Sequence, residues 1–121
     1  MGLDMYALKT REEIIGEVDF NIEDAEKIHS WRKHPDLHGW MARLYYEKGG
    51  KGEHFNCDCV LLTDSDLDSL EAAILGNALP GTAGFFFGES DGSEKEDDLD
   101  FVRKAREAIK DGYKVFYDSW W

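Results

Sequence analysis

The densest group of chemically capable side chains lies in residues 31–40, WRKHPDLHGW. These ten positions hold two tryptophans, two histidines, an arginine and a lysine. Histidine can act as an acid or a base near neutral pH, and arginine binds carboxylate and phosphate groups. Two interpretations stay open: a ligand pocket, or a folded element whose buried Trp rings need polar partners.

The pocket hypothesis brings this segment together with the start of the chain and a wall formed by Phe85–Phe87. Arg32 and Lys33 would bind an anionic group, and His38 would serve as acid, base or hydrogen-bond donor. Adjacent helical residues point about 100° apart, so Arg32 and Lys33 do not both face one pocket squarely. No residue is assigned a catalytic role. The predicted ligand-binding residues are Asp4, Trp31, Arg32, Lys33, His38 and Trp40.

Histidine and cysteine spacings raise the question of a metal site. His34 and His38 are four residues apart, which suits two ligands on one helix face, but His34 precedes Pro35 and is predicted at a cap outside the regular helix. Cys57 and Cys59 are two apart in a predicted strand, about 7 Å between Cα atoms, too far for an easy disulfide. We therefore expect reduced thiols, no metal ion and no cofactor. A catalytic pair between one cysteine and His38 stays open.

Two segments account for the net charge of −12. Residues 53–71 contain six acids and no Lys or Arg, and residues 89–100 contain seven acids and one Lys, so each contributes −6. Acidic surfaces repel phosphate and attract basic protein surfaces, which disfavours direct nucleic-acid binding. The predicted acidic partner surface comprises Asp64, Asp66, Asp68, Glu94, Glu96, Asp97 and Asp98.

These charges favour a small accessory protein that binds a protein partner with a basic surface, and a binding role over an enzymatic one. A narrower form is mimicry of nucleic acid on a host protein. The alternative is a small-molecule-binding domain or small enzyme with a pocket around Asp4, Arg32, His38 and Trp40. The closing Trp120 and Trp121 fit either an exposed partner surface or a buried strand. The oligomeric state stays open.

Local patterns predict the strands that must position these residues. Alternation predicts a strand over 2–8, and apolar content predicts further strands over 53–62 and 113–121. Residues 13–20 either pair with the first strand or form a loop. No apolar run approaches the ~20 residues of a membrane span, and the start of the chain lacks a secretory pattern, so we expect a cytoplasmic protein without membrane contact.

Capping signals predict the helices. Asn21 as an N-cap predicts a helix over 22–33, and Pro35 begins a second one. Capping boxes at Thr63–Asp66 and Ser93–Glu96 begin two more, the last over 94–110. The expected fold is a single α+β domain over 1–121, with a sheet of three to four strands packed with about four helices.

A series of short motifs runs in one order along the chain: MGLDMY, WRK before LHGW, NC before LT, LP before GFFFG, and FYDSWW. Together they resemble a family of small uncharacterised bacteriophage and bacterial proteins, often automatically labelled phosphoglycerate kinase. Such a kinase has two large nucleotide-binding lobes, whereas this chain has no nucleotide motif. The resemblance therefore implies a phage-like origin and no particular reaction. The matching positions are Asp4, Trp31, Arg32, Lys33, His38, Trp40, Cys57, Gly84 and Gly88.

Overall fold

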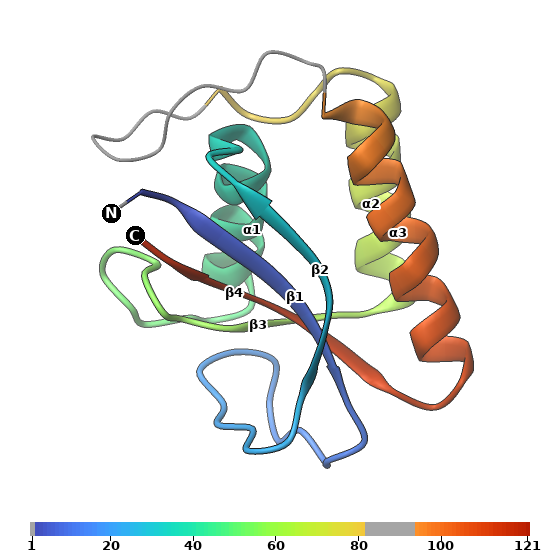
Figure 1. The fold of residues 1–121 in the computed structure, drawn as a ribbon. Helices are drawn as coiled ribbons and strands as arrows, with labels where there is room; N and C mark the ends of the chain where they lie inside the picture. Colours follow the sequence, from blue (N-terminus) through green and yellow to red (C-terminus); the bar gives the residue numbers. More distant parts are fainter. Residues whose placement is uncertain (1, 82–93) are drawn as a thin grey trace.

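The computed structural model describes residues 2–81 and 94–121. Its four strands form one antiparallel sheet in the order β2–β1–β4–β3 (Figure 1). The strands are β1 (Asp4–Thr10), β2 (Glu26–Arg32), β3 (Val60–Leu62) and β4 (Lys114–Trp120). The helices of the described ranges are α1 (Pro35–Glu47), α2 (Asp64–Leu75) and α3 (Lys95–Lys110). The mixed α+β class is therefore confirmed.

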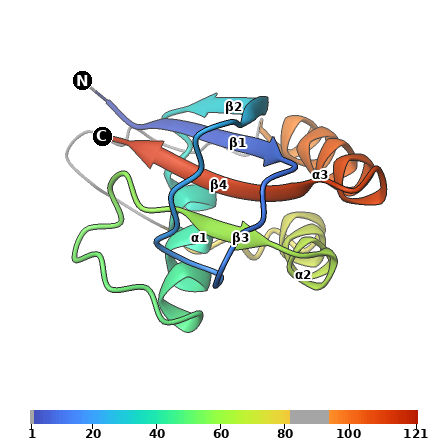
Figure 2. The same cartoon turned by 90° about the horizontal axis from the view of Figure 1, so that it is seen from below.

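The helices pack on one face of the sheet, and this arrangement explains the alternation along the strands (Figure 2). In β1, Met5 and Ala7 are fully buried toward the helices, whereas Asp4 and Tyr6 are half-buried on the opposite face. In β4, Val115, Tyr117 and Ser119 are buried toward the helices, whereas Phe116 on the opposite face is also buried and Asp118 is half-buried. The strands predicted at the two ends of the chain are confirmed.

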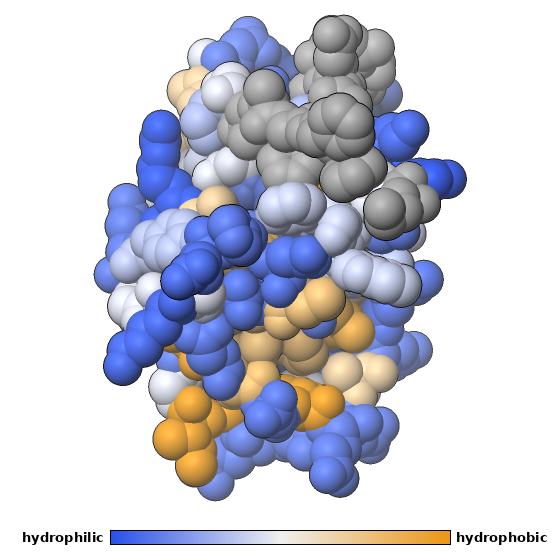
Figure 3. All heavy atoms as spheres, turned by 90° about the vertical axis from the view of Figure 1, so that its left-hand side faces the viewer, coloured by the Kyte–Doolittle hydropathy of each residue, from blue (hydrophilic) through white to orange (hydrophobic). Residues whose placement is uncertain are grey.

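The opposite face of the sheet, which we call the open face, is covered at one end by a described loop. There Phe20, from the loop between β1 and β2, packs edge-to-face on Phe116 with 5.3 Å between ring centroids. Figure 3 shows part of this side of the molecule, where apolar side chains gather in the lower half with hydrophilic side chains around them. The remainder of the open face carries no helix from the described part of the chain.

Residues 13–20 form a loop that protects the outer edge of β3. The N–H of Leu61 donates to the carbonyl of Glu17 at 2.8 Å, and the N–H of Asp19 donates to the carbonyl of Cys59 at 3.2 Å. Val18 forms an isolated antiparallel bridge with Val60. The loop therefore bonds beside β3 and not β1, and it satisfies backbone groups that an exposed edge strand would leave open.

Two sequence predictions about local structure are wrong. The predicted helix over 22–33 is replaced by β2, where His29 and Trp31 are buried and Ser30 between them is exposed. Pairing with β1 and burial against α3 outweigh the local helical pattern. Of the predicted strand over 53–62 only β3 forms, because Phe55 and Cys57 adopt left-handed backbone with φ of 47° and 62°.

The helix starts follow the capping signals where the structure describes them. Pro35 occupies the first turn of α1, and the capping box at Thr63 is complete: the N–H of Asp66 donates to Thr63 Oγ1 at 3.2 Å, and the N–H of Thr63 donates to Asp66 Oδ2 at 2.9 Å. Helix α3 begins at Lys95 without a side-chain cap from Glu94.

Ser93 and Phe85–Phe87 lie outside the described residues. No helix in the described ranges is long and apolar enough to cross a membrane.

Replacing Thr63 by alanine should lower the free energy of unfolding by about 1 kcal/mol, because the first turn of α2 loses its side-chain acceptor. Thr63→Ser keeps the hydroxyl and should retain most of that stability. Urea unfolding followed by circular dichroism measures both variants. Equal losses in the two would show that packing of the Thr63 methyl group, and not the cap, stabilises this helix start.

Candidate functional site

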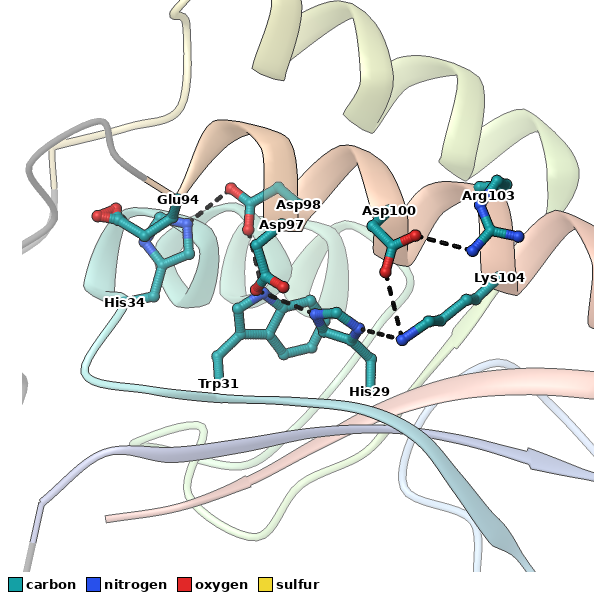
Figure 4. A network of polar contacts seen from close by, with 9 residues as sticks. All are labelled: His29, Trp31, His34, Glu94, Asp97, Asp98, Asp100, Arg103 and Lys104. Carbon is teal, nitrogen blue, oxygen red and sulfur yellow. Dashed lines mark hydrogen bonds and ion pairs between the residues drawn. The ribbon is translucent and has the colours of Figure 1, made fainter.

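A buried carboxylate connects α3 to β2 and to the start of α1 (Figure 4). Asp98 is only 2% exposed. Its Oδ1 accepts a hydrogen bond from the indole N–H of Trp31 at 3.0 Å, and its Oδ2 lies 2.8 Å from Nε2 of His34. Trp31 is near the end of β2 and His34 directly precedes α1, so one side chain fixes three elements relative to one another.

A second histidine extends this network along α3. Nε2 of His29 lies 3.0 Å from Asp97, and its Nδ1 lies 3.2 Å from Nζ of Lys104. Because the lysine ammonium can only donate, Nδ1 accepts and Nε2 carries the proton. The His29 ring also packs on Trp31, with 4.6 Å between ring centroids. The network thus combines hydrogen bonding with aromatic packing.

The environment of His34 favours its charged form. Burial lowers its pKa, but the hydrogen bond and charge of Asp98, with the charges of Glu94 and Asp36, outweigh burial and leave the pKa raised above 6.5. Nδ1 of His34 lies 3.7 Å from Glu94. Both ring nitrogens therefore face carboxylates, which is the arrangement of an ion-paired structural histidine.

A cavity of about 140 Å³ lies beside His34. Its described lining contains no serine, threonine or cysteine, so these residues offer His34 no hydroxyl or thiol to activate. The described lining residues are His34, Asp36, Ile74, Asn77, Leu79, Glu94, Lys95 and Asp98.

His38 is a core residue. It is 3% exposed, its Nδ1 lies 2.7 Å from the hydroxyl of Tyr117, and its ring lies 5.0 Å from that of Phe55. Burial lowers the pKa of His38 to about 4, so the imidazole is neutral at pH 7. Burial also raises the pKa of Tyr117 well above its usual value, so the phenol stays protonated.

The structure does not bring Asp4 and Arg32 together with His38 and Trp40, the four residues of the predicted pocket. Asp4 and Arg32 form an ion pair of 3.6 Å on the open face, whereas His38 contacts Tyr117 on the helix-covered face. Asp4 and Trp40 line different cavities. Asp4 and Arg32 point to the open face from β1 and β2, whereas His38 and Trp40 belong to α1 on the other face of the sheet, an arrangement that local sequence spacing does not reveal.

The other two residues of that prediction serve the fold. Trp31 binds Asp98 on the helix-covered face. Lys33 has a positive φ of 57°, and its N–H donates to the carbonyl of Leu3 at 2.8 Å, which turns the chain from β2 toward α1.

Most carboxylates of the predicted acidic surface are engaged within the protein. The assignment of Asp98 to a surface is wrong, because it is buried. Asp66 completes the cap of α2 and pairs with Lys48, Asp97 pairs with His29, and Glu94 is largely buried beside His34. The exposed members are Asp64, Asp68, Glu96 and also Asp97, whose side chain stays 54% exposed beside His29.

Sequence reasoning missed a group of aromatic and acidic side chains on the open face. The register between β1 and β4 places Asp4 beside Trp120 and Tyr6 beside Asp118. Trp120 is 66% exposed. The alternation of β4 in the sequence predicts that Asp118 and Trp120 share a face. It does not show that Asp4 and Tyr6 lie beside them, because that depends on the pairing of β1 with β4.

A small cavity opens at this end of the sheet. Gly2, Asp4, Trp120 and Trp121 line about 130 Å³, and we call this site the terminal notch. Trp121 is held in place: its indole N–H donates to the carbonyl of Phe55 at 3.2 Å, and its backbone N–H donates to Asn56 Oδ1 at 3.0 Å. The notch therefore combines one anchored indole, one exposed indole and one carboxylate.

Asp118 on the open face is close enough to a further carboxylate, Asp58, to feel its charge. Burial, together with the charge of Asp58, raises the pKa of Asp118. Burial and the charge of Asp19 likewise raise the pKa of Asp58. These groups repel one another, and a nearby cation would relieve that repulsion.

No family model matches the chain, and neither the curated proteins nor the solved structures contain a match. The resemblance to a phage and bacterial family stays a prediction. Within residues 2–81 and 94–121 no group of three or more His, Cys, Asp or Glu side chains is placed to hold a metal ion. Cys57 and Cys59 are free thiols.

Replacing His38 by alanine should lower the free energy of unfolding at pH 7 by about 2–3 kcal/mol, through lost packing and an unpaired Tyr117 hydroxyl. The folded-state pKa lies below the unfolded value, so the stability from neutral His38 is full above pH 6.5 and is lost as the pH falls toward about 4. The gap between wild type and variant should shrink by about 2 kcal/mol from pH 7 to pH 5.

Urea unfolding at several pH values measures that gap. His54→Ala is the matched control, because the His54 side chain is 76% exposed; its effect should stay within about 0.5 kcal/mol. A gap that does not change with pH would contradict the assignment of His38 as a neutral core residue.

Replacing Asp98 by asparagine should lower the free energy of unfolding by about 3 kcal/mol, because it breaks a buried ionic hydrogen bond. The pKa of His34, followed by NMR, should fall. A raised histidine pKa stabilises the fold below pH 6.5 and ceases to do so as the pH rises through the folded-state value. That loss should disappear in the variant.

Asp100→Asn provides the control on the same helix, since Asp100 pairs with exposed Arg103 and lies at the surface. It should leave both the stability and the His34 titration almost unchanged. The same His34 titration in wild type and Asp98→Asn would show that Asp98 does not hold the histidine proton.

Proposed function

We propose that this protein is a small accessory protein that binds a protein partner with a basic surface through the open face of its sheet. The observation that carries the proposal is the exposed side chain of Trp120 next to Asp4 in strand register. A phage-like origin and a cytoplasmic location belong to the proposal, and the free thiols of the described cysteines are compatible with a reducing compartment.

The chemistry of the open face supports a protein ligand. Trp and Tyr are enriched among the residues that dominate protein interfaces, and Trp120 and Tyr6 lie on neighbouring strands there. Asp4 and Asp118 occupy the alternating positions beside them. An aromatic surface with interspersed carboxylates suits lysine and arginine side chains, which combine ion pairing with contact to ring faces.

Charge argues against nucleic acid as the direct ligand. Aromatic side chains on a sheet can stack on bases, but such sites also carry a basic groove that follows the phosphates. Here the face carries Asp4 and Asp118 together with only scattered cations such as Arg32 and Lys27, and the whole chain has a charge of −12. Mimicry of nucleic acid is less favoured by the structure than by the sequence alone, because Asp66, Asp97 and Asp98 have partners within the fold.

A pair of charge-matched double variants tests the location of the surface. Asp4→Asn with Asp118→Asn neutralises the open face, and Asp64→Asn with Glu96→Gln neutralises exposed positions on α2 and α3. The probe is a fluorescent peptide of alternating lysine, arginine and glycine, and the readout is its anisotropy at several salt concentrations. The open-face pair should weaken binding about five- to tenfold, and the helix pair less than about twofold.

Both double variants remove two negative charges, so nonspecific attraction would weaken equally in each. Equal losses would contradict an open-face site and indicate diffuse attraction to an acidic protein. A larger loss of peptide affinity in the helix pair would indicate that the partner binds at the first turns of α2 and α3.

A further inference from the structure

We infer that the terminal notch is a receptor for one arginine side chain of the partner. This inference rests on the proposed function and names the chemistry of its central contact. The notch lies at the end of β1 and β4, where Asp4 and Trp120 are direct neighbours in the antiparallel register. It offers a carboxylate and two indole rings within one small cavity.

The size of the notch suits a flat, single side-chain group. Its volume is about 130 Å³, and a cavity of about 150 Å³ accommodates a benzene molecule. A guanidinium group is planar and smaller than benzene, so it fits without rearrangement of the strands. A whole peptide segment does not fit, which limits the occupant to one inserted side chain.

The chemistry of the lining favours arginine over lysine. Guanidinium stacks on indole faces and presents two N–H groups to one carboxylate, whereas ammonium is a compact and strongly hydrated charge. Asp4 can accept such a pair of hydrogen bonds, and the side chain of Asp4 is 40% exposed. Trp120, 66% exposed, supplies a free ring surface.

The site is organised before the ligand arrives. Hydrogen bonds to Phe55 and Asn56 fix Trp121. At this end of β4, Trp120 pairs with Asp4 of β1, and the N–H of Cys57 donates to the carbonyl of Ser119 at 2.8 Å. A rigid site loses less conformational entropy on binding than a mobile one. Trp120 is then the main group whose rotamer must be fixed by the ligand.

Arg32 shows that a guanidinium already reaches this carboxylate. Its Nε lies 3.6 Å from Asp4 Oδ1, and its side chain is 66% exposed. A surface ion pair of this kind contributes little free energy and is readily exchanged. Arg32 is thus an internal competitor for Asp4, so its removal should strengthen binding of an external arginine.

The test uses three otherwise identical, glycine- and lysine-flanked peptides that carry arginine, lysine or citrulline at one central position. Citrulline keeps the planar shape of arginine but has no charge. The arginine peptide should bind about three- to tenfold more tightly than either of the others. In NMR titrations it should also shift the indole N–H resonance of Trp120 more than resonances on α2.

Three variants locate the effect. Trp120→Ala and Asp4→Asn should each remove the preference for arginine, with unchanged spectra elsewhere confirming that the fold is intact. Arg32→Gln should raise the affinity for the arginine peptide about twofold or more, a gain that a folding defect does not produce. An unchanged or lower affinity in Arg32→Gln would overturn the inferred competition at Asp4.

The outcomes separate this inference from the proposed function. Equal binding of the three peptides, with the open-face double variant still impaired, overturns the arginine receptor and leaves a basic-partner surface. Absence of binding by all three lysine-flanked peptides overturns the proposed function itself. An arginine preference that survives Trp120→Ala places the receptor elsewhere and overturns the assignment of the notch.

Discussion

The fold depends on the satisfaction of one buried carboxylate. Asp98 lies in the core, where an unpaired charge costs several kcal/mol. Trp31 and His34 stand at the two ends of the short connection from β2 to α1, and both bind Asp98. The charge can therefore be buried only when β2, α1 and α3 take their native positions together. The aromatic and basic residues of 31–40 are for this reason mainly a folding element.

This internal use of polar groups determines where binding capacity remains. On the helix-covered face, His29, His34 and His38 are all buried with polar partners. On the open face, loop packing on Phe116 covers one end, and Trp120 at the other end is exposed. The two-layer architecture thus separates an interior whose histidines already have polar partners from a surface that can accept a partner protein.

The sequence predicts elements whose signals are local and fails where the determinant is distant. Pro35 and the Thr63 capping box mark their helices correctly because each acts within one turn. Residues 22–33 have helical periodicity, but β2 forms because His29 and Trp31 contact α3, more than sixty residues away. The terminal notch likewise cannot be predicted from local sequence patterns, because Asp4 and Trp120 come from opposite ends of the chain.

Net charge is also a poor guide to the location of an acidic surface in this protein. Carboxylates from both acidic segments bind groups within the protein: Asp66 caps α2 and pairs with Lys48, and Asp97 accepts a hydrogen bond from His29. By contrast, burial and the charge of Asp58 raise the pKa of Asp118, and burial and the charge of Asp19 raise the pKa of Asp58. A cation that approaches these two groups gains attraction and also relieves their repulsion, whereas one that approaches a capped or paired carboxylate must compete with an existing partner. An acid such as Asp118, whose pKa is raised by burial and by a neighbouring charge, can thus matter more for recognition than the larger number of acids on the helices.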